Sequence, residues 1–192
     1  MTARTHDLVA FASLLTVASI IPPAELNFST TVTCLVGSVI GALAPDMDQA
    51  TNRLWDLLPA GNIIGRILRN LMLRHRTISH SLLGIFIFYK ILDFAIPRLL
   101  NPAYVNGQLV IAAIMIGLVS HIVSDMFTKE GVPILFPITV KVGIPPFEAL
   151  RITTGKFVEN FLVFPGVLAY IFWLVVERRE VFVNLVKLIQ SK

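Results

Sequence analysis

Five long apolar segments limit the folds that this sequence can adopt. They cover residues 8–21, 28–44, 82–96, 109–123 and 161–176. Hydrophobic residues make up 55% of the chain and charged residues only 15%, whereas a soluble domain has about 45–50% and about 25%. The mean hydropathy is +0.77. We therefore expect an all-α protein, a polytopic membrane bundle of about five short apolar helices, and not a water-soluble globule.

The apolar segments are short for membrane helices. Each contains 14 to 17 residues, and a simple spanning helix needs roughly 20. Three explanations of the short length are possible: the helices tilt, polar flanking residues extend each helix, or the bundle is partly embedded in one leaflet. We favour extension by flanking residues. Pro22, Pro45, Pro97 and Pro102 stand where helix stops are expected. The length predicts a single domain over residues 1–192.

Three further stretches are predicted to lie at the membrane surface. Residues 49–81 are rich in arginine, and helical spacing of the apolar residues within 63–71 predicts an amphipathic interfacial helix. Residues 124–160 include the run V-P-I-L-F-P-I-T-V-K-V, which predicts a short extended hairpin or re-entrant loop. Residues 181–189 are predicted to form another interfacial amphipathic helix.

All four histidines lie in polar islands at the ends of apolar segments, most of them close to carboxylates. Imidazoles and carboxylates are ligands of divalent metals, and ionisable residues are rare at membrane helices without a function. The predicted metal ligands are His6, Asp46, Asp48, His75, His80, His121 and Asp125. The single cysteine, Cys34, excludes a disulfide framework and a cysteine-rich zinc motif.

The spacing of these residues predicts local geometry. His121 and Asp125 are four residues apart, so they share one helix face and can chelate one ion. Asp125 stands near a helix C-terminus, where the helix dipole disfavours negative charge and a cation would compensate. Asp46 and Asp48 point the same way if the chain is extended there.

The two middle histidines are predicted to straddle a loop-to-helix junction. His75 and His80 are five residues apart, so they cannot share one helix face. Thr77 or Ser79 is then the expected N-cap of the next helix. Arg76 suits phosphate recognition because a guanidinium matches phosphate oxygens. The basic loops fit lipid headgroups, and no nucleic-acid partner is expected.

Alternating helices bring the candidate ligands together. If five helices run up and down, every predicted ligand lies on one membrane face, together with Glu159, a candidate ligand or general base. Both basic connections fall on that face, so the positive-inside rule predicts that it is cytoplasmic. The basic tail at Arg178 and Arg179 disagrees, so either the last segment does not fully span or the bias is weak there.

The ordered motifs resemble a known family. T-H-D, A-P-D-M-D, H-R-T-I-S-H-S-L and S-H-I-V-S-D-M-F-T-K-E-G-V-P-I-L-F-P resemble, from His6 to Glu159, the YdjM-like family of inner-membrane-associated, metal-dependent hydrolases. Gln49 departs from the histidine that many members carry there. The resemblance implies a multi-pass protein of the bacterial inner membrane. The helical His/Asp pattern is also similar, more loosely, to that of zinc-dependent phospholipase C enzymes.

We therefore expect a membrane-bound hydrolase of a phosphoester, such as a phospholipid or lipid phosphate. Asp125, Glu159 and Arg76 are the predicted catalytic residues. One or two divalent ions would activate water, with zinc favoured and manganese or iron as alternatives. There are two rival functions: a metal transporter or sensor, and a scaffold with a degenerate metal site. A transporter should hold its ligands near mid-membrane in broken helices, which favours the enzyme.

Overall fold

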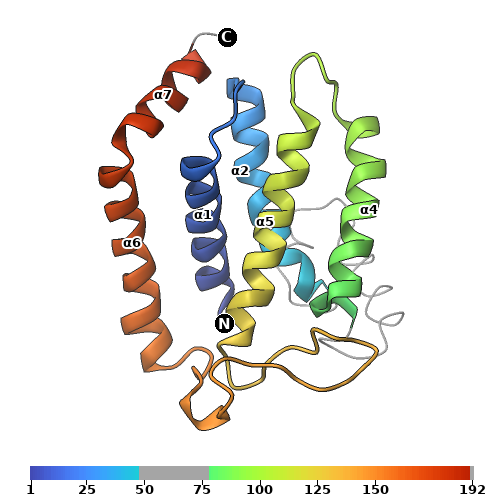
Figure 1. Cartoon of the computed structure of the whole chain (residues 1–192), viewed down its shortest axis with the longest axis vertical. Helices are drawn as coiled ribbons and strands as arrows, with labels where there is room; N and C mark the ends of the chain where they lie inside the picture. Colours follow the sequence, from blue (N-terminus) through green and yellow to red (C-terminus); the bar gives the residue numbers. More distant parts are fainter. Residues whose placement is uncertain (48–77, 191–192) are drawn as a thin grey trace.

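Six α-helices form a bundle in the computed structural model, which describes residues 1–47 and 78–190 (Figure 1). They are α1 (Ala3–Ile20), α2 (Phe28–Leu43), α4 (Leu82–Leu99), α5 (Gly107–Met126), α6 (Phe164–Glu177) and α7 (Arg179–Gln190). Short 3₁₀ turns are η1 (Ala44–Asp46), η3 (Ile78–His80) and η4 (Glu148–Leu150), and η5 (Glu159–Val163) is a π-helical turn. The described residues hold no sheet, so the predicted all-α class is confirmed.

Helix α5 occupies the centre of the bundle. It packs against α1, α2 and α4, while α6 lies beside α1 at one edge and α7 continues α6 (Figure 1). The N-terminus lies at the end of the bundle where α5 finishes, and α7 lies at the opposite end. Leu118 and Ile122 of α5 are fully buried, together with Val132 from the loop that follows.

Two glycines let α2 and α5 approach closely. A Cβ at Gly41 would clash with the backbone carbonyl of Ile114, and one at Gly117 would clash with the carbonyl of Ser38. Small residues of this kind allow membrane helices to pack backbone against backbone. The contact fixes the height of α2 relative to α5, and therefore the relative height of the residues at their ends.

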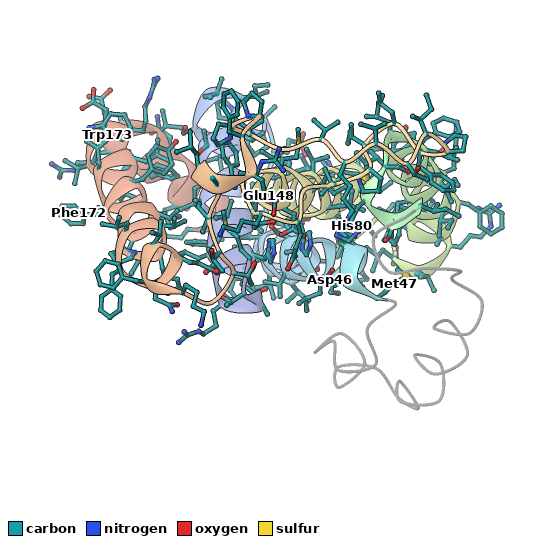
Figure 2. All side chains as sticks on the ribbon, turned by 90° about the horizontal axis from the view of Figure 1, so that it is seen from below. Asp46, Met47, His80, Glu148, Phe172 and Trp173 are labelled. Carbon is teal, nitrogen blue, oxygen red and sulfur yellow. The ribbon has the colours of Figure 1, made fainter. Side chains whose placement is uncertain are left out.

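Three helical stretches are long and apolar enough to cross a membrane among the described residues. They are Phe28–Asp46, Gly107–Met126 and Glu159–Glu177. Helix α4 is also largely apolar, but it carries Lys90, Asp93 and Arg98. Phe172 and Trp173 of α6 point away from the bundle, as lipid-facing side chains do (Figure 2).

Polar flanks extend the helices, as predicted. Helix α1 begins at Ala3 and α5 ends at Met126, so both include residues outside the apolar segments. The prediction that Pro97 ends its helix is wrong, because α4 continues to Leu99. A proline near a helix end removes one backbone hydrogen bond, and the other bonds of the last turn are still made.

The chain between α5 and η5 is irregular but is held in place by two backbone bridges. Val132 and Val142 pair in antiparallel fashion with N–H···O distances of 2.9 and 2.8 Å, which confirms the predicted hairpin in a minimal form. Thr128 and Ile152 form a parallel bridge. The predicted helix at 181–189 is confirmed by α7. The amphipathic helix predicted within 63–71 lies outside the described residues.

Candidate metal centre

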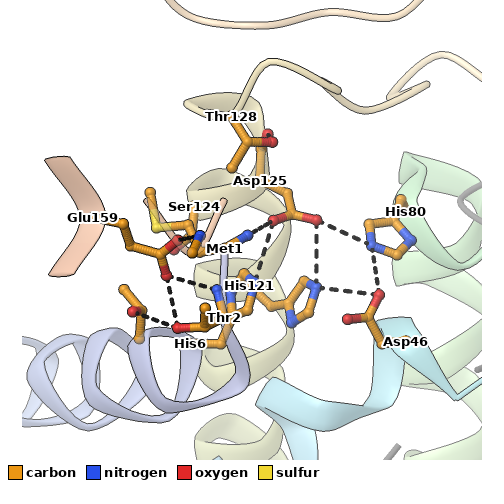
Figure 3. Close-up of polar contacts among 12 residues, drawn as sticks. Met1, Thr2, His6, Asp46, His80, His121, Ser124, Asp125, Thr128 and Glu159 are labelled. Atoms are coloured by element: carbon orange, nitrogen blue, oxygen red, sulfur yellow. Dashed lines mark hydrogen bonds and ion pairs between the residues drawn. The ribbon is translucent and has the colours of Figure 1, made fainter. Parts of the chain in front are cut away.

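Five of the seven predicted metal ligands meet at one end of the bundle (Figure 3). His6 lies in the first turn of α1, Asp46 ends η1, His80 ends η3, and His121 and Asp125 lie in the last two turns of α5. The structure therefore brings these five together at one end of the bundle. Asp48 and His75 lie outside the described residues.

Asp46 reaches the cluster through a helical extension of α2. Ala44 and Pro45 continue α2 as the 3₁₀ turn η1, and Met47 is also helical, with φ −61° and ψ −18°. The extended conformation considered for this motif is therefore wrong at Asp46. The proline sits at the start of η1, where its missing N–H is tolerated, and it does not stop the chain from turning.

A short turn before α4 presents His80. The N-cap of α4 is Ser81, whose hydroxyl accepts the Gly84 N–H at 3.1 Å, so the predicted Thr77 or Ser79 cap is wrong. The Ser79 hydroxyl lies 3.1 Å from Nδ1 of His80 instead. A hydrogen bond on one ring nitrogen orients an imidazole and directs the other nitrogen to a metal.

The tautomer of His121 follows from its partner. Its Nδ1 lies 2.5 Å from the backbone carbonyl oxygen of Ala42. A carbonyl oxygen only accepts, so Nδ1 carries the proton and, in the neutral ring, Nε2 presents a lone pair to the cluster. Metal-binding histidines commonly donate their second N–H to a backbone carbonyl. The close packing of α2 on α5 creates this contact.

Two imidazole nitrogens face the same two carboxylate oxygens. Nε2 of His80 lies 3.5 Å from Oδ1 of Asp46 and 3.7 Å from Oδ2 of Asp125. Nε2 of His121 lies 3.8 Å from the same Asp46 oxygen and 3.7 Å from the same Asp125 oxygen. Ligands about 2.1 Å from a tetrahedral zinc ion lie about 3.4 Å apart. These separations are too long for hydrogen bonds and are close to those around a metal ion.

The second oxygen of Asp125 faces a second group. Its Oδ1 lies 3.2 Å from Nε2 of His6 and 2.6 Å from the amino group of Met1. The His6 ring stacks on His121, with ring centroids 3.7 Å apart and an interplanar angle of 8°. His6, His121 and Asp125 thus form a further set of potential ligands. Asp125 joins the two sets, one oxygen toward each.

Burial is costly for the imidazole nitrogens of this cluster that make no hydrogen bond, whereas Asp125 is contacted by the amino group of Met1. His6, His80, His121 and Asp125 are at most 2% exposed, and only Asp46 reaches the surface. Among the described residues, neither ring nitrogen of His6 nor Nε2 of His121 makes a hydrogen bond. Buried polar atoms normally find partners, and buried carboxylates need compensating positive charge. Nitrogen and carboxylate donors in this arrangement fit a divalent ion such as zinc.

Glu159 lies beside the cluster but has other partners. One carboxylate oxygen accepts hydrogen bonds from the backbone N–H of Thr2 at 2.6 Å and from its hydroxyl at 2.8 Å. The other oxygen accepts the Gly155 N–H at 2.7 Å. Glu159 belongs to neither set of potential ligands among the described residues. Arg76, the third predicted catalytic residue, lies outside the described residues.

Sequence reasoning missed three supporting groups of this site. They are the carbonyl of Ala42, the hydroxyl of Ser79 and the N-terminal turn at Thr2. A serine directly before a candidate ligand was the only available signal. The contacts of the Ala42 carbonyl and of Thr2 depend on how helices far apart in the sequence pack together. No local sequence pattern predicts them.

Comparison with known proteins supports the resemblance seen in the motifs. The YdjM inner membrane protein family model matches residues 1–188. The chain is 29% identical over 162 residues to the uncharacterized protein YvsG of Bacillus subtilis, covering 84% of this chain and 87% of that protein. It is 26% identical over 130 residues to the inner membrane protein YdjM of Escherichia coli, covering 65% of this chain and 58% of that protein. No solved structure matches.

Proposed function

The chain belongs to the YdjM inner membrane protein family, and from this membership and its buried His/Asp cluster we propose that it is a membrane-bound, metal-dependent hydrolase. Its substrate is a phosphoester such as a phospholipid or a lipid phosphate. The observation that carries the proposal is the pair of imidazole nitrogens from His80 and His121, each of which lies 3.5 to 3.8 Å from a carboxylate oxygen of Asp46 and from one of Asp125.

The protein residues prepare the site for a metal. A divalent ion held by these donors would make a bound water more nucleophilic and would polarise a phosphoryl oxygen. His80 and His121 have their rings oriented by Ser79 and by the Ala42 carbonyl. Asp125 supplies negative charge to both sets of ligands, and His6 extends the site on its far side, where His6, His121 and Asp125 would hold a second ion.

The position of the cluster supports a lipid substrate. The ligands stand at the ends of apolar helices, so they lie at the depth of lipid headgroups and not of acyl chains. Asp46 is the ligand that reaches the surface, so substrate approaches from its side. Arg76 is proposed to orient the phosphate, and the site is proposed to face the cytoplasm.

The rival function is transport of a divalent metal. Transporters place their ion sites near mid-membrane, between broken helices. Here α5 is continuous through both His121 and Asp125, and the ligands gather where α5 ends. This arrangement supports chemistry at a surface over passage through the membrane.

The test is a paired metal and activity measurement. The protein is purified in detergent, its bound metals are quantified, and hydrolysis of phospholipids and lipid phosphates is assayed. We expect stoichiometric metal and phosphoester hydrolysis in the wild type, and loss of both in Asp125→Ala and His80→Ala. Asp93→Ala, which removes an exposed carboxylate from α4, is the matched control and should behave as wild type.

Two outcomes would contradict the proposal. Absence of bound metal after reconstitution with zinc, manganese and iron would remove its basis. Stoichiometric metal without hydrolysis, accompanied by metal flux into vesicles, would favour transport.

A further inference from the structure

A buried carboxylate ties the start of α1 to the metal centre. Glu159 is 0% exposed, and all three hydrogen bonds described above involve groups near the first turn of α1 or the loop before α6. Glu159 belongs to neither set of potential metal ligands among the described residues, so metal binding does not explain these three hydrogen bonds. A fully buried carboxylate is costly unless it is hydrogen-bonded, so this arrangement requires an explanation.

His6 depends directly on the turn that Glu159 holds. The carbonyl oxygen of Thr2 accepts the N–H groups of Thr5 and His6 at 3.0 and 3.1 Å. The N–H and hydroxyl of the same Thr2 residue donate to Glu159. The position of Thr2 therefore fixes the first turn of α1, and with it the direction of the His6 ring.

The other side of the His6–Asp125 contact is anchored to the same framework. The carbonyl oxygen of Ile152 accepts the N–H of Lys129, and the Ile152 N–H donates to Phe127, directly after α5. From Ile152 the chain needs only a short turn to reach Glu159. That turn includes Gly155, whose φ of 72° favours glycine. Asp125 and Glu159 are thus held by one continuous piece of structure.

The π-helical turn η5 places the carboxylate. It covers Glu159–Val163 and runs directly into α6. Such turns are rare and occur frequently at functional sites, because the extra residue redirects side chains. Here Glu159 is directed toward α1 and is buried, whereas Phe161 and Leu162 of the same turn are exposed.

We infer that Glu159 is a positioning residue: it holds the first turn of α1 so that His6 is set against Oδ1 of Asp125. This inference rests on the proposed metal site and gives Glu159 a role other than that of a general base. Loss of its carboxylate should therefore weaken the contribution of His6 to metal binding and leave the four donors around Asp46 in place.

The experiment is a double-mutant cycle on metal affinity. Cobalt(II) is titrated into wild type, His6→Ala, Glu159→Ala and the double variant in detergent, and its visible absorption spectrum reports the ligand set. Removal of residues that orient metal ligands costs about 10–100-fold in affinity. We expect Glu159→Ala to reproduce the affinity and spectrum of His6→Ala, with no further loss in the double variant, because the two residues act on one contact.

Two more variants separate positioning from catalysis and from misfolding. Glu159→Gln keeps an oxygen that accepts from Thr2 but turns an NH2 group toward the Gly155 N–H, so it should keep more metal affinity and hydrolysis than Glu159→Ala. If Glu159 were a general base, both variants would lose hydrolysis. Thr2→Pro removes both donors to Glu159 and suits the backbone of Thr2, whose φ is −71°. It should weaken cobalt binding as Glu159→Ala does.

The control removes a different link between α1 and α6. Thr16 and Tyr170 share a hydrogen bond of 2.8 Å further along these helices, so Thr16→Val should leave cobalt binding at the wild-type level. Wild-type affinity in Glu159→Ala, or independent losses that multiply in the double variant, would overturn the inference.

Hydrogen exchange of residues 2–9 distinguishes this inference from the proposed function. We expect faster exchange in Glu159→Ala and Thr2→Pro, but not in Thr16→Val, whether or not metal is bound. Unchanged exchange would refute the positioning role. Faster exchange in a protein that binds no metal would support the positioning role and refute the proposed metal site.

Discussion

The polar side chains at the two ends of the bundle have different partners: helix-terminal N–H groups at one end, and one another at the other end. At the end opposite the metal centre, Asn27 caps α2 by accepting the Thr30 N–H at 2.7 Å. Asn106 caps α5 by accepting the N–H groups of Gln108 and Leu109 at 3.1 and 3.2 Å. These neutral side chains complete the helix ends. At the metal centre, imidazoles and carboxylates face one another at distances that suit an ion.

A cavity can be wide without having a donor set for a metal ion. One of about 690 Å³ lies between the loops at the Asn27 and Asn106 end. Its polar lining includes these two caps and Thr30, whose hydroxyl accepts the Asn106 N–H at 3.0 Å. The candidate site is therefore identified by imidazole and carboxylate groups that face one another at distances that suit an ion, and not by the volume of a cavity.

The largest expected effect comes from a histidine that both ligand sets share. His121→Ala removes a donor from each set and should lower metal affinity by at least about 100-fold, beyond the loss typical of an orienting residue. Isothermal titration with zinc checks this prediction. Ser124→Ala, one turn along the same buried face of α5, should bind zinc as the wild type does. Wild-type zinc affinity in His121→Ala would contradict the assignment of the metal site to this end of the bundle.

Helix spacing should have an intermediate effect. Gly41→Ala places a Cβ against the carbonyl of Ile114 and should destabilise the protein by about 1–3 kcal/mol through overpacking. It should also lower zinc affinity, because α2 carries the Ala42 carbonyl that orients His121. Denaturant unfolding and zinc titration measure the two effects.

Gly166→Ala provides the matched control for this substitution. A Cβ at Gly166 in α6 would meet no heavy atom within 4 Å. Its zinc affinity should equal that of the wild type, and its stability should not fall, because alanine favours the helix more than glycine does. If both glycine variants behaved alike, close packing of α2 on α5 would not be what sets the ligand geometry.

The smallest effect is expected at the opposite end. Asn106→Ala removes the cap of α5 and should destabilise the protein by about 1 kcal/mol. Its zinc affinity should be unchanged, because the cap and the metal centre lie at opposite ends of α5. Thermal unfolding with and without zinc tests this separation, and a reduced affinity would show that the two ends are coupled.

Much of the fold was predictable from hydrophobic patterning. The apolar segments gave the helices, and polar residues at their ends extended them, because helix formation continues until a cap or break intervenes. The pairing of His121 with Asp125 followed from helical geometry alone. The N-cap of α4 and the end of that helix were predicted wrongly, since Ser79 and Ser81 are equally suitable caps by composition.

The sequence by itself determined that this is a helical membrane protein whose histidines and aspartates gather at one end. That conclusion needs only hydropathy, helix periodicity and alternating direction, which are local properties. Tertiary structure decided which donor atoms meet, how Asp125 divides its oxygens between His6 and the other histidines, and why Glu159 is buried. These depend on distances of a few ångströms between helices, which the packing of α1, α2, α5 and η5 sets and no local pattern specifies.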